Sequence, residues 1–197
     1  MTLVLDAVSL PRGAVRDLSA EFGPGVHLIV GPNGVGKTSL LNAIAGTLPP
    51  TSGSICLDGI RLTAGTDQVV LAPNAPPEIP WIRAGLLLDF IASLYPSTRR
   101  DAKAVASIVQ RLGIAGFMDA PLGTLSAGSA RKLLLASALI AAPPVMLFDE
   151  PTNETDAASI VAFLEMIGEI AARKVVIITT HHAKDLESLA PRVLSLA

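Results

Sequence analysis

The sequence predicts an α/β fold in which a mostly parallel β-sheet is covered by helices on both faces. Three observations predict it. Short apolar stretches alternate along the chain with longer stretches of helical periodicity. The short stretches are apolar at almost every position, which is typical of parallel strands that are buried on both faces. Finally, a glycine-rich segment, residues 31–39, lies between one such strand and the start of a helix.

The glycine-rich segment is a complete phosphate-binding motif, G-x-x-x-x-G-K-[ST]. Glycines allow successive backbone N–H groups to point at phosphate oxygens, and the helix N-terminus adds partial positive charge. We expect Lys37 to reach the β- and γ-phosphates and the Thr38 hydroxyl to bind Mg²⁺. The motif predicts a P-loop nucleotide-binding core whose nucleotide-binding residues are Gly31, Pro32, Asn33, Gly34, Val35, Gly36, Lys37, Thr38 and Ser39.

The elements of the first half are mostly short strands. Alternating apolar residues predict strands over 2–8 and 16–22, and Gly23-Pro24-Gly25 predicts a turn into the strand at 26–30. A helix is expected at 39–45. A short strand and turn at 54–59 and a buried strand at 69–71 follow, and a proline-rich linker covers 72–80.

From residue 81 to 120 the pattern is helical. Two apolar faces are expected there, one from Leu86, Leu87, Phe90, Ile91 and Leu94 and one from Val105, Ile108, Val109 and Leu112. The C-terminal part is expected to contain a helix at 131–141 after a turn at 126–129, a buried strand at 145–148, a helix at 157–171, a buried strand at 175–179, a short helix at 185–189 and a strand at 192–196.

Composition excludes several classes of function. The net charge is −2 and the only basic run is Arg99-Arg100, so no electrostatic footprint for nucleic acid is present. Cys56 is the single cysteine, which excludes an intrachain disulfide. We expect Cys56 to be a small buried apolar residue. No signal peptide is visible, and Pro143-Pro144 breaks the longest apolar stretch, residues 133–148. We therefore expect a single-domain, cytoplasmic protein.

Two acids follow the strand expected at 145–148. Asp149, at the tip of the strand, can hold Mg²⁺ through water, and Glu150 can polarise an attacking water as a general base. Together with the phosphate-binding loop, this pair predicts hydrolysis of a nucleoside triphosphate.

Three further segments carry a resemblance to a known family. Leu125, Ser126, Ala127, Gly128 and Ser129 resemble the Leu-Ser-Gly-Gly-Gln signature of ATP-binding cassette (ABC) ATPases. Residues 151–156 are similar to the Pro-Thr-Asn-x-Leu-Asp stretch of that family, and Thr180-His181 resemble its switch histidine. The spacings from Ser126 to Asp149 and from Glu150 to His181 match those of the family. The resemblance covers the whole chain, with a weaker likeness to cassettes of the haem-exporter type.

The resemblance implies one ABC ATPase domain over residues 1–197. Its nucleotide-binding core would span 1–73 and 122–197 and would include an N-terminal antiparallel β subdomain, and a helical subdomain would span 74–121. In this family the signature faces the γ-phosphate of ATP held by a second subunit. The resemblance therefore implies ATP and Mg²⁺ as cofactors and a head-to-tail homodimer or pseudo-dimer. Asp156 would cross the dimer interface, and His181 would orient the attacking water and Glu150.

Three departures from the family pattern are visible. Asn74 stands where the family usually has a Gln that contacts Mg²⁺, so the expected metal site is Thr38, Asn74 and Asp149, unless Asn74 only supports a turn between prolines. Ala127 replaces a signature glycine, which is tolerated if its φ is negative. Leu10 or Pro11 replaces the aromatic residue that stacks on adenine, which implies apolar contact with the base instead.

Two functions remain open at this point. The first is the ATP-hydrolysing subunit of an ABC transporter, held at the inner face of the cell membrane by a separate transmembrane permease. Ile79, Trp81 and Ile82 would then lie beside the groove that receives a coupling helix, although Trp81 equally suits the core of the helical block. The second is a soluble ABC ATPase that acts in cofactor assembly or another non-transport role. A P-loop kinase would leave the signature and His181 unexplained.

Overall fold

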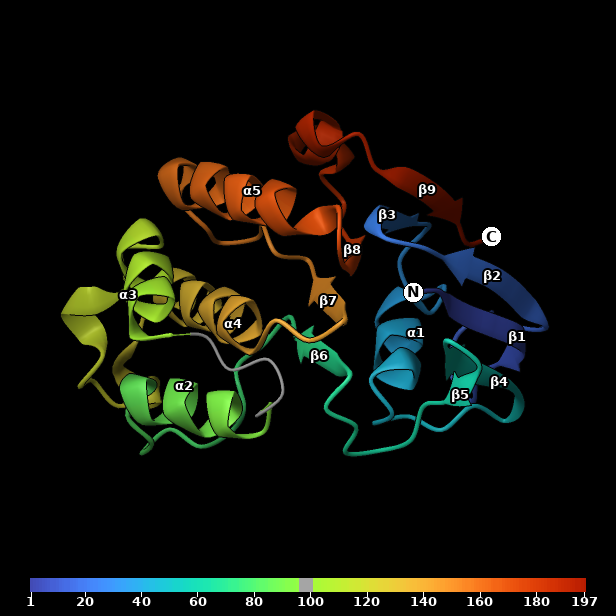
Figure 1. Cartoon of the computed structure of the whole chain (residues 1–197), viewed down its shortest axis with the longest axis horizontal. Helices are drawn as coiled ribbons and strands as arrows, with labels where there is room; N and C mark the ends of the chain where they lie inside the picture. Colours follow the sequence, from blue (N-terminus) through green and yellow to red (C-terminus); the bar gives the residue numbers. More distant parts are fainter. Residues whose placement is uncertain (96–100) are drawn as a thin grey trace.

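Two β-sheets organise the computed structural model, which describes residues 1–95 and 101–197 (Figure 1). The larger sheet is parallel and has the strand order β6-β7-β8-β3-β9. Its strands are β3 (Gly25–Val30), β6 (Val69–Ala72), β7 (Val145–Asp149), β8 (Val175–Thr179) and β9 (Arg192–Ser195). The smaller sheet is antiparallel, in the order β2-β1-β4-β5, with β1 (Leu3–Ser9), β2 (Leu18–Phe22), β4 (Ser52–Leu57) and β5 (Ile60–Arg61). The predicted α/β fold class is therefore confirmed.

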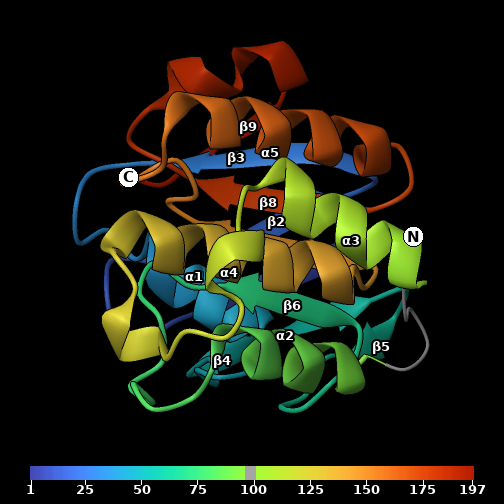
Figure 2. The same ribbon diagram turned by 90° about the vertical axis from the view of Figure 1, so that its left-hand side faces the viewer.

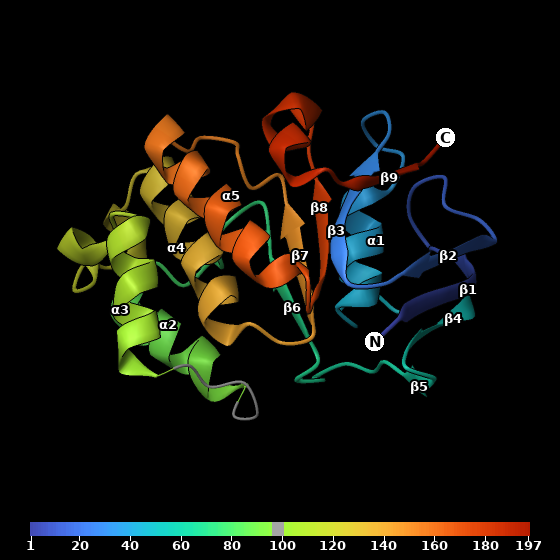
Figure 3. The ribbon, with the colours of Figure 1, turned by 45° about the horizontal axis from the view of Figure 1, so that its top comes forward.

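The parallel sheet is covered on both faces, as its apolar strands require. On one face, α1 (Lys37–Ile44) fills the space between the two sheets, and α4 (Ala127–Ala141) and α5 (Ala157–Ala171) cover the other (Figures 1 and 3). Alternate residues of one strand therefore enter different cores. In β7, Met146 and Phe148 belong to the core on the side of α4 and α5, whereas Val145 and Leu147 belong to the core with α1 and the antiparallel sheet.

Two further helices, α2 (Ala84–Ser93) and α3 (Ala102–Arg111), pack against α4 on the side away from the antiparallel sheet (Figure 2). Part of the block that was expected to be helical, residues 96–100, lies outside the described residues. The face predicted for α3 is confirmed, because Ile108 and Leu112 are buried.

The apolar face predicted for α2 is wrong in part. Leu87 and Leu88 are buried, but Leu86, Phe90 and Leu94 are each more than half exposed. The start of α2 is held by backbone hydrogen bonds from Ala84 and Gly85 to the carbonyl oxygens of residues 120 and 118. These bonds fix the rotation of a helix that is apolar on both sides, and the periodicity of the sequence alone does not select the buried side.

Helix boundaries differ from expectation mainly at α4. It begins at Ala127 rather than 131, because Ser126 is its N-cap and the Ser126 Oγ accepts a hydrogen bond from the Ser129 N–H at 3.2 Å. The two-residue strand β5 was not expected. Short 3₁₀ turns complete the chain: η2 (Ala115–Phe117), η3 (Leu122–Thr124) and η4 (Ala183–Leu189). Across residues 1–95 and 101–197, every helix is too short or too polar to cross a membrane.

Candidate nucleotide site

The residues predicted to bind phosphate, hold the metal and catalyse hydrolysis gather at the carboxyl ends of four parallel strands, where ligands of open α/β sheets bind. The phosphate loop follows β3, Asn74 follows β6, Asp149 ends β7, and His181 follows β8. These ends enclose a hollow of about 370 Å³. It is lined by Arg12, Gly13, Asn33, Gly34, Gly36, Lys37, Thr38, Ser39, Asn74, Asp149, Glu150 and His181.

The loop between β3 and α1 has a backbone conformation and a lysine position that suit phosphate binding. Gly36 is the N-cap of α1 and has φ +117°, in a region that L side chains rarely adopt. The Lys37 side chain is almost buried, and its Nζ donates to the carbonyl oxygens of Gly31 at 2.8 Å and Pro32 at 3.3 Å. The ammonium group is therefore already held inside the loop, beside the N-terminus of α1, where partial positive charge favours anions.

A hydroxyl–carboxylate chain connects the loop to the centre of the sheet. Thr38 Oγ1 donates to Asp149 Oδ2 at 2.9 Å, and Thr179 Oγ1 donates to Asp149 Oδ1 at 2.5 Å. Thr179 is fully buried and Asp149 is 4 % exposed. Hard oxygen donors of this kind suit Mg²⁺, which proteins bind through one or two carboxylates together with substrate phosphates. Thr38 and Asp149 therefore fit a magnesium ion at this place.

Glu150 and His181 form the second polar pair of the hollow. Glu150 Oε2 accepts from the backbone N–H of His181 at 3.1 Å, and Glu150 Oε1 lies 3.2 Å from His181 Nε2. The Glu150 backbone has φ +53°, a left-handed conformation that turns the chain sharply after β7 and is held by a hydrogen bond from the Glu150 N–H to the Thr179 carbonyl. The arrangement holds a nearly buried carboxylate at the edge of the hollow, as a general base requires.

Sequence reasoning missed Arg131, a buried cation beside the hollow whose Nη1 and Nη2 atoms make four hydrogen bonds. It lies in α4 and is 4 % exposed. Its Nη1 donates to the carbonyl oxygens of Pro73 at 2.8 Å and Asp149 at 3.3 Å, and its Nη2 donates to the backbone and side-chain oxygens of Asn74. Burial lowers the pKa of Arg131, while the negative charges of nearby carboxylates, Glu154 first among them, act to raise it. The guanidinium remains charged, because arginine keeps its proton in proteins.

Arg12 and Gly13 were also missed. They lie in the loop between β1 and β2 and line the hollow. Gly13 packs so closely on the phosphate loop that a Cβ at this position would lie 2.8 Å from Gly36 Cα. Of the two residues expected to contact the base, Leu10 is excluded because it is buried in the core, whereas Pro11 is exposed and its contact with the base stays a prediction. Arg12 is also exposed and lies beside the phosphate loop.

None of residues 125–129 lines the hollow that the described residues form. Ser126 and Ala127 are exposed at the N-terminus of α4, and the Ala127 backbone is helical, so alanine is tolerated there. Gly128 is required for close packing, since a Cβ would lie 2.5 Å from the Glu154 carbonyl oxygen. Asp156 caps α5 through Ser159 and pairs with Lys132 at 3.2 Å. The signature is thus presented at the surface rather than to the pocket of its own chain.

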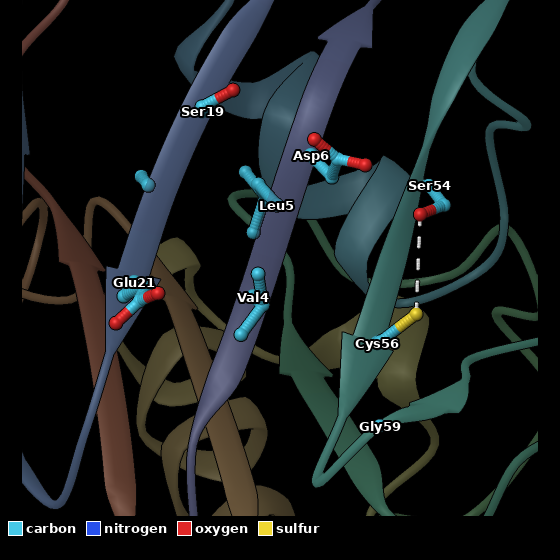
Figure 4. A pocket seen from close by; sticks show the side chains of 9 residues that line it. Val4, Leu5, Asp6, Ser19, Glu21, Ser54, Cys56 and Gly59 are labelled. Carbon is cyan, nitrogen blue, oxygen red and sulfur yellow. Dashed lines mark hydrogen bonds between the residues drawn. The ribbon is translucent and has the colours of Figure 1, made fainter.

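A larger hollow of about 550 Å³ lies on the outer face of the antiparallel sheet (Figure 4). Asp6, Glu21, Ser54 and Cys56 point into it from three different strands. Cys56 is only partly buried there, contrary to expectation, because alternate residues of β4 face outward. This hollow contains none of the predicted motif residues and no basic side chain that would hold a phosphate.

Comparisons with known proteins agree with this geometry. The sequence profile of the family described as "ABC transporter" matches residues 15–153. The cytochrome c biogenesis ATP-binding export protein CcmA of Pseudomonas putida KT2440 is 34% identical over 208 residues, covering 100% of this chain and 98% of that protein. ABC transporter A family member 4 of Dictyostelium discoideum is 30% identical over 94% of this chain, which spans only 12% of that relative.

A solved structure has the same fold. It is described as the dimeric structure of a post-hydrolysis state of an ATP-binding cassette bound to ADP and Pi. Its TM-score is 0.81 at 20% sequence identity, and the match covers 98% of this chain and 94% of that one.

Proposed function

The chain belongs to the ABC transporter family and is an ATP-binding ATPase, and we propose that it powers transport through a separate membrane subunit. One observation carries the assignment of the catalytic centre. The phosphate loop and the acids that follow β7 meet in one hollow, with Thr38 Oγ1 at 2.9 Å from Asp149. The expected division into a core (1–73 and 122–197) and a helical subdomain (74–121) is part of this proposal.

The roles of the residues follow from their chemistry. The backbone N–H groups of residues 31–36 and the ammonium of Lys37 bind the phosphates of ATP. Thr38 and Asp149 hold Mg²⁺, which neutralises negative charge on the phosphates when it is bound. Glu150 accepts a proton from the attacking water, and His181 holds the Glu150 carboxylate in place.

We propose that two copies, or this chain and a homologous one, clasp ATP head to tail. Support comes from the exposed position of Ser126 at the N-terminus of α4, outside the pocket of its own chain. A helix N-terminus with bare N–H groups is suited to an anion supplied from outside. Asp156, nearby at the start of α5, would then lie at the interface between the subunits.

The substitution Glu150→Gln tests whether ATP binds in a composite site, that is, one formed by residues of two chains. This change removes the proton acceptor while keeping the shape of the side chain, so hydrolysis falls by about 100- to 10,000-fold and an ATP-bound dimer accumulates. Light scattering with saturating MgATP measures the molecular mass in solution. Lys103→Gln, a substitution at an exposed position of α3, is the control. If the Glu150→Gln protein remains monomeric, the composite site is wrong for the isolated subunit. In the unaltered protein, specific activity should rise with protein concentration.

The membrane partner has its own support. Trp81 is 71% exposed, so it does not belong to the core of the helical block. Leu86 and Phe90 on α2, and Leu94 at its C-cap, follow Trp81 as an exposed apolar stripe. An exposed apolar patch of this kind marks a contact surface. We propose that this surface docks the transmembrane subunit and places the chain at the inner face of the membrane.

Purification of the tagged chain from detergent-solubilised membranes tests this partner and separates the two candidate functions. Transport predicts recovery of a protein with several membrane spans and loss of that protein with Trp81→Ser. Recovery of soluble partners alone would favour a cofactor-assembly ATPase. The family profile described as "ABC transporter" and the similarity to an ATP-binding export protein favour the first function.

A further inference from the structure

The contact between Arg131 and Asn74 fixes the orientation of an amide that faces the nucleotide pocket. An Asn side chain carries an acceptor oxygen and a donor nitrogen, which are hard to distinguish by shape alone. Arginine donates hydrogen bonds only, so the Asn74 atom that meets Arg131 Nη2 must be the oxygen. The amide nitrogen is therefore turned away from Arg131, and it is the polar atom of Asn74 that remains available to the hollow.

Charge reinforces this orientation. The Asn74 side-chain oxygen already accepts from Nη2 of a buried guanidinium, whose Nη1 donates to the carbonyl oxygens of Pro73 and Asp149. A magnesium ion on the same oxygen would lie beside that fixed positive charge, and like charges a few ångströms apart in a partly buried site repel strongly. The Asp149 carboxylate oxygens accept from the hydroxyls of Thr38 and Thr179 rather than from this guanidinium, and their negative charge attracts a metal ion.

We propose that Asn74 serves the pocket as a hydrogen-bond donor to the phosphate end of the nucleotide, and that Arg131 is the positioning residue that sets this orientation. The inference rests on the proposed nucleotide site and deepens it. It leaves Mg²⁺ to Thr38 and Asp149, in place of the contact between Asn74 and the metal that the family pattern implies. It also explains why a cation is buried in α4 beside the segment that follows β6.

Binding of the non-hydrolysable analogue AMP-PNP, measured with Mg²⁺ and again with EDTA, tests the role of Asn74. Asn74 is exposed, so Asn74→Ala and Asn74→Asp should fold. A lost donor weakens binding about three- to tenfold, and by the same factor with and without the metal. Asn74→Asp should be at least as weak, because a carboxylate has no donor and repels phosphate. A loss confined to the Mg²⁺ condition, binding kept by Asn74→Asp, or no loss at all would overturn the proposal.

A double-mutant cycle tests the role of Arg131. Arg131→Met should weaken AMP-PNP binding as much as Asn74→Ala, and the double variant should be no weaker than either single one. Arg131→Lys should restore part of the binding, since it keeps the charge and one donor at a time. Additive losses would show that Arg131 acts independently and would refute the positioning role.

Arg111→Met is the matched control, because Arg111 pairs on the surface with Glu165 and Glu169, outside the hollow. If Arg131→Met does not fold, Arg131→Lys takes its place in the cycle, with the same two outcomes. Should the unaltered protein fail to bind AMP-PNP, the proposed nucleotide site itself would be wrong, a result distinct from failure of this inference.

Discussion

The nucleotide pocket and helix α2 differ in the kind of side chain that each buries or exposes. Around the pocket, polar groups are buried and bonded to one another: Lys37, Asp149 and Glu150 are each less than 10% exposed and each makes a hydrogen bond. On α2, large apolar groups such as Leu86 and Phe90 are more than half exposed. Buried polar groups need hydrogen-bond partners, and these bonds hold the side chains of the pocket in one arrangement. Exposed apolar groups of this size mark a surface that contacts another molecule.

We expect the largest effect when the free energy of unfolding is compared between substitutions on the buried and the exposed sides of α2. Leu87→Ala empties part of the core against α4 and should lower the free energy of unfolding by about 2–5 kcal/mol. Phe90→Ala, three residues later on the exposed side, should change it by about 0.5 kcal/mol or less, although more atoms are removed. Urea unfolding followed by circular dichroism measures both. Equal losses would mean that the outer side of α2 is also packed in solution.

On the pocket side, Lys37→Ala should weaken ATP binding about 100-fold. The change removes the only lysine lining the hollow of the described residues, and hydrogen bonds to charged groups are worth about 1.5–3 kcal/mol each. Titration with a fluorescent ATP analogue provides the measurement. Lys103→Ala, an exposed lysine on α3, should bind as the unaltered protein does. An unchanged affinity for Lys37→Ala would refute the assignment of the phosphate loop.

The same contrast explains what could be predicted from sequence. The phosphate motif is contiguous, and the strand at 175–179 and the helix at 157–171 were located to the residue because their apolar patterns are unambiguous. The buried side of α2 was not predicted, since that helix is apolar on both sides. Arg131 was missed because two of its acceptors lie 57 and 58 residues away along the chain, and no local pattern connects residues at that separation.

Arg12 should have a smaller effect than Lys37, because it is exposed at the rim of the hollow. Its planar guanidinium can contact either the adenine ring or a phosphate, one or two residues after the positions, Leu10 or Pro11, where the family pattern has an aromatic residue. Arg12→Ala should raise KM for ATP about three- to tenfold with kcat nearly unchanged, which is the signature of a lost binding contact. Arg61→Ala, an exposed arginine in β5, is the control. A fall in kcat without a change in KM would contradict a role in binding.

The smallest effect belongs to Asp156, which lies at the start of α5 and pairs with Lys132 on α4, outside both the pocket and α2. Hydrogen bonds from the Ser159 N–H and hydroxyl, and then Lys132, lower the pKa of Asp156 to about 2 from an ordinary 3.8. A lowered carboxyl pKa adds stability above the unfolded value of 3.8, and this stability disappears as the pH falls towards 2.

Asp156→Asn keeps an N-cap but cannot ionise, so it isolates this contribution. The Asp156 side chain is 54% exposed, so solvent screening limits the difference from the unaltered protein to about 0.5 kcal/mol at pH 6. The difference should shrink by roughly half at pH 3, midway between the two pKa values. Urea unfolding at both pH values measures it. A difference that did not change with pH would place the stabilisation in the geometry of the cap rather than in the charge of Asp156.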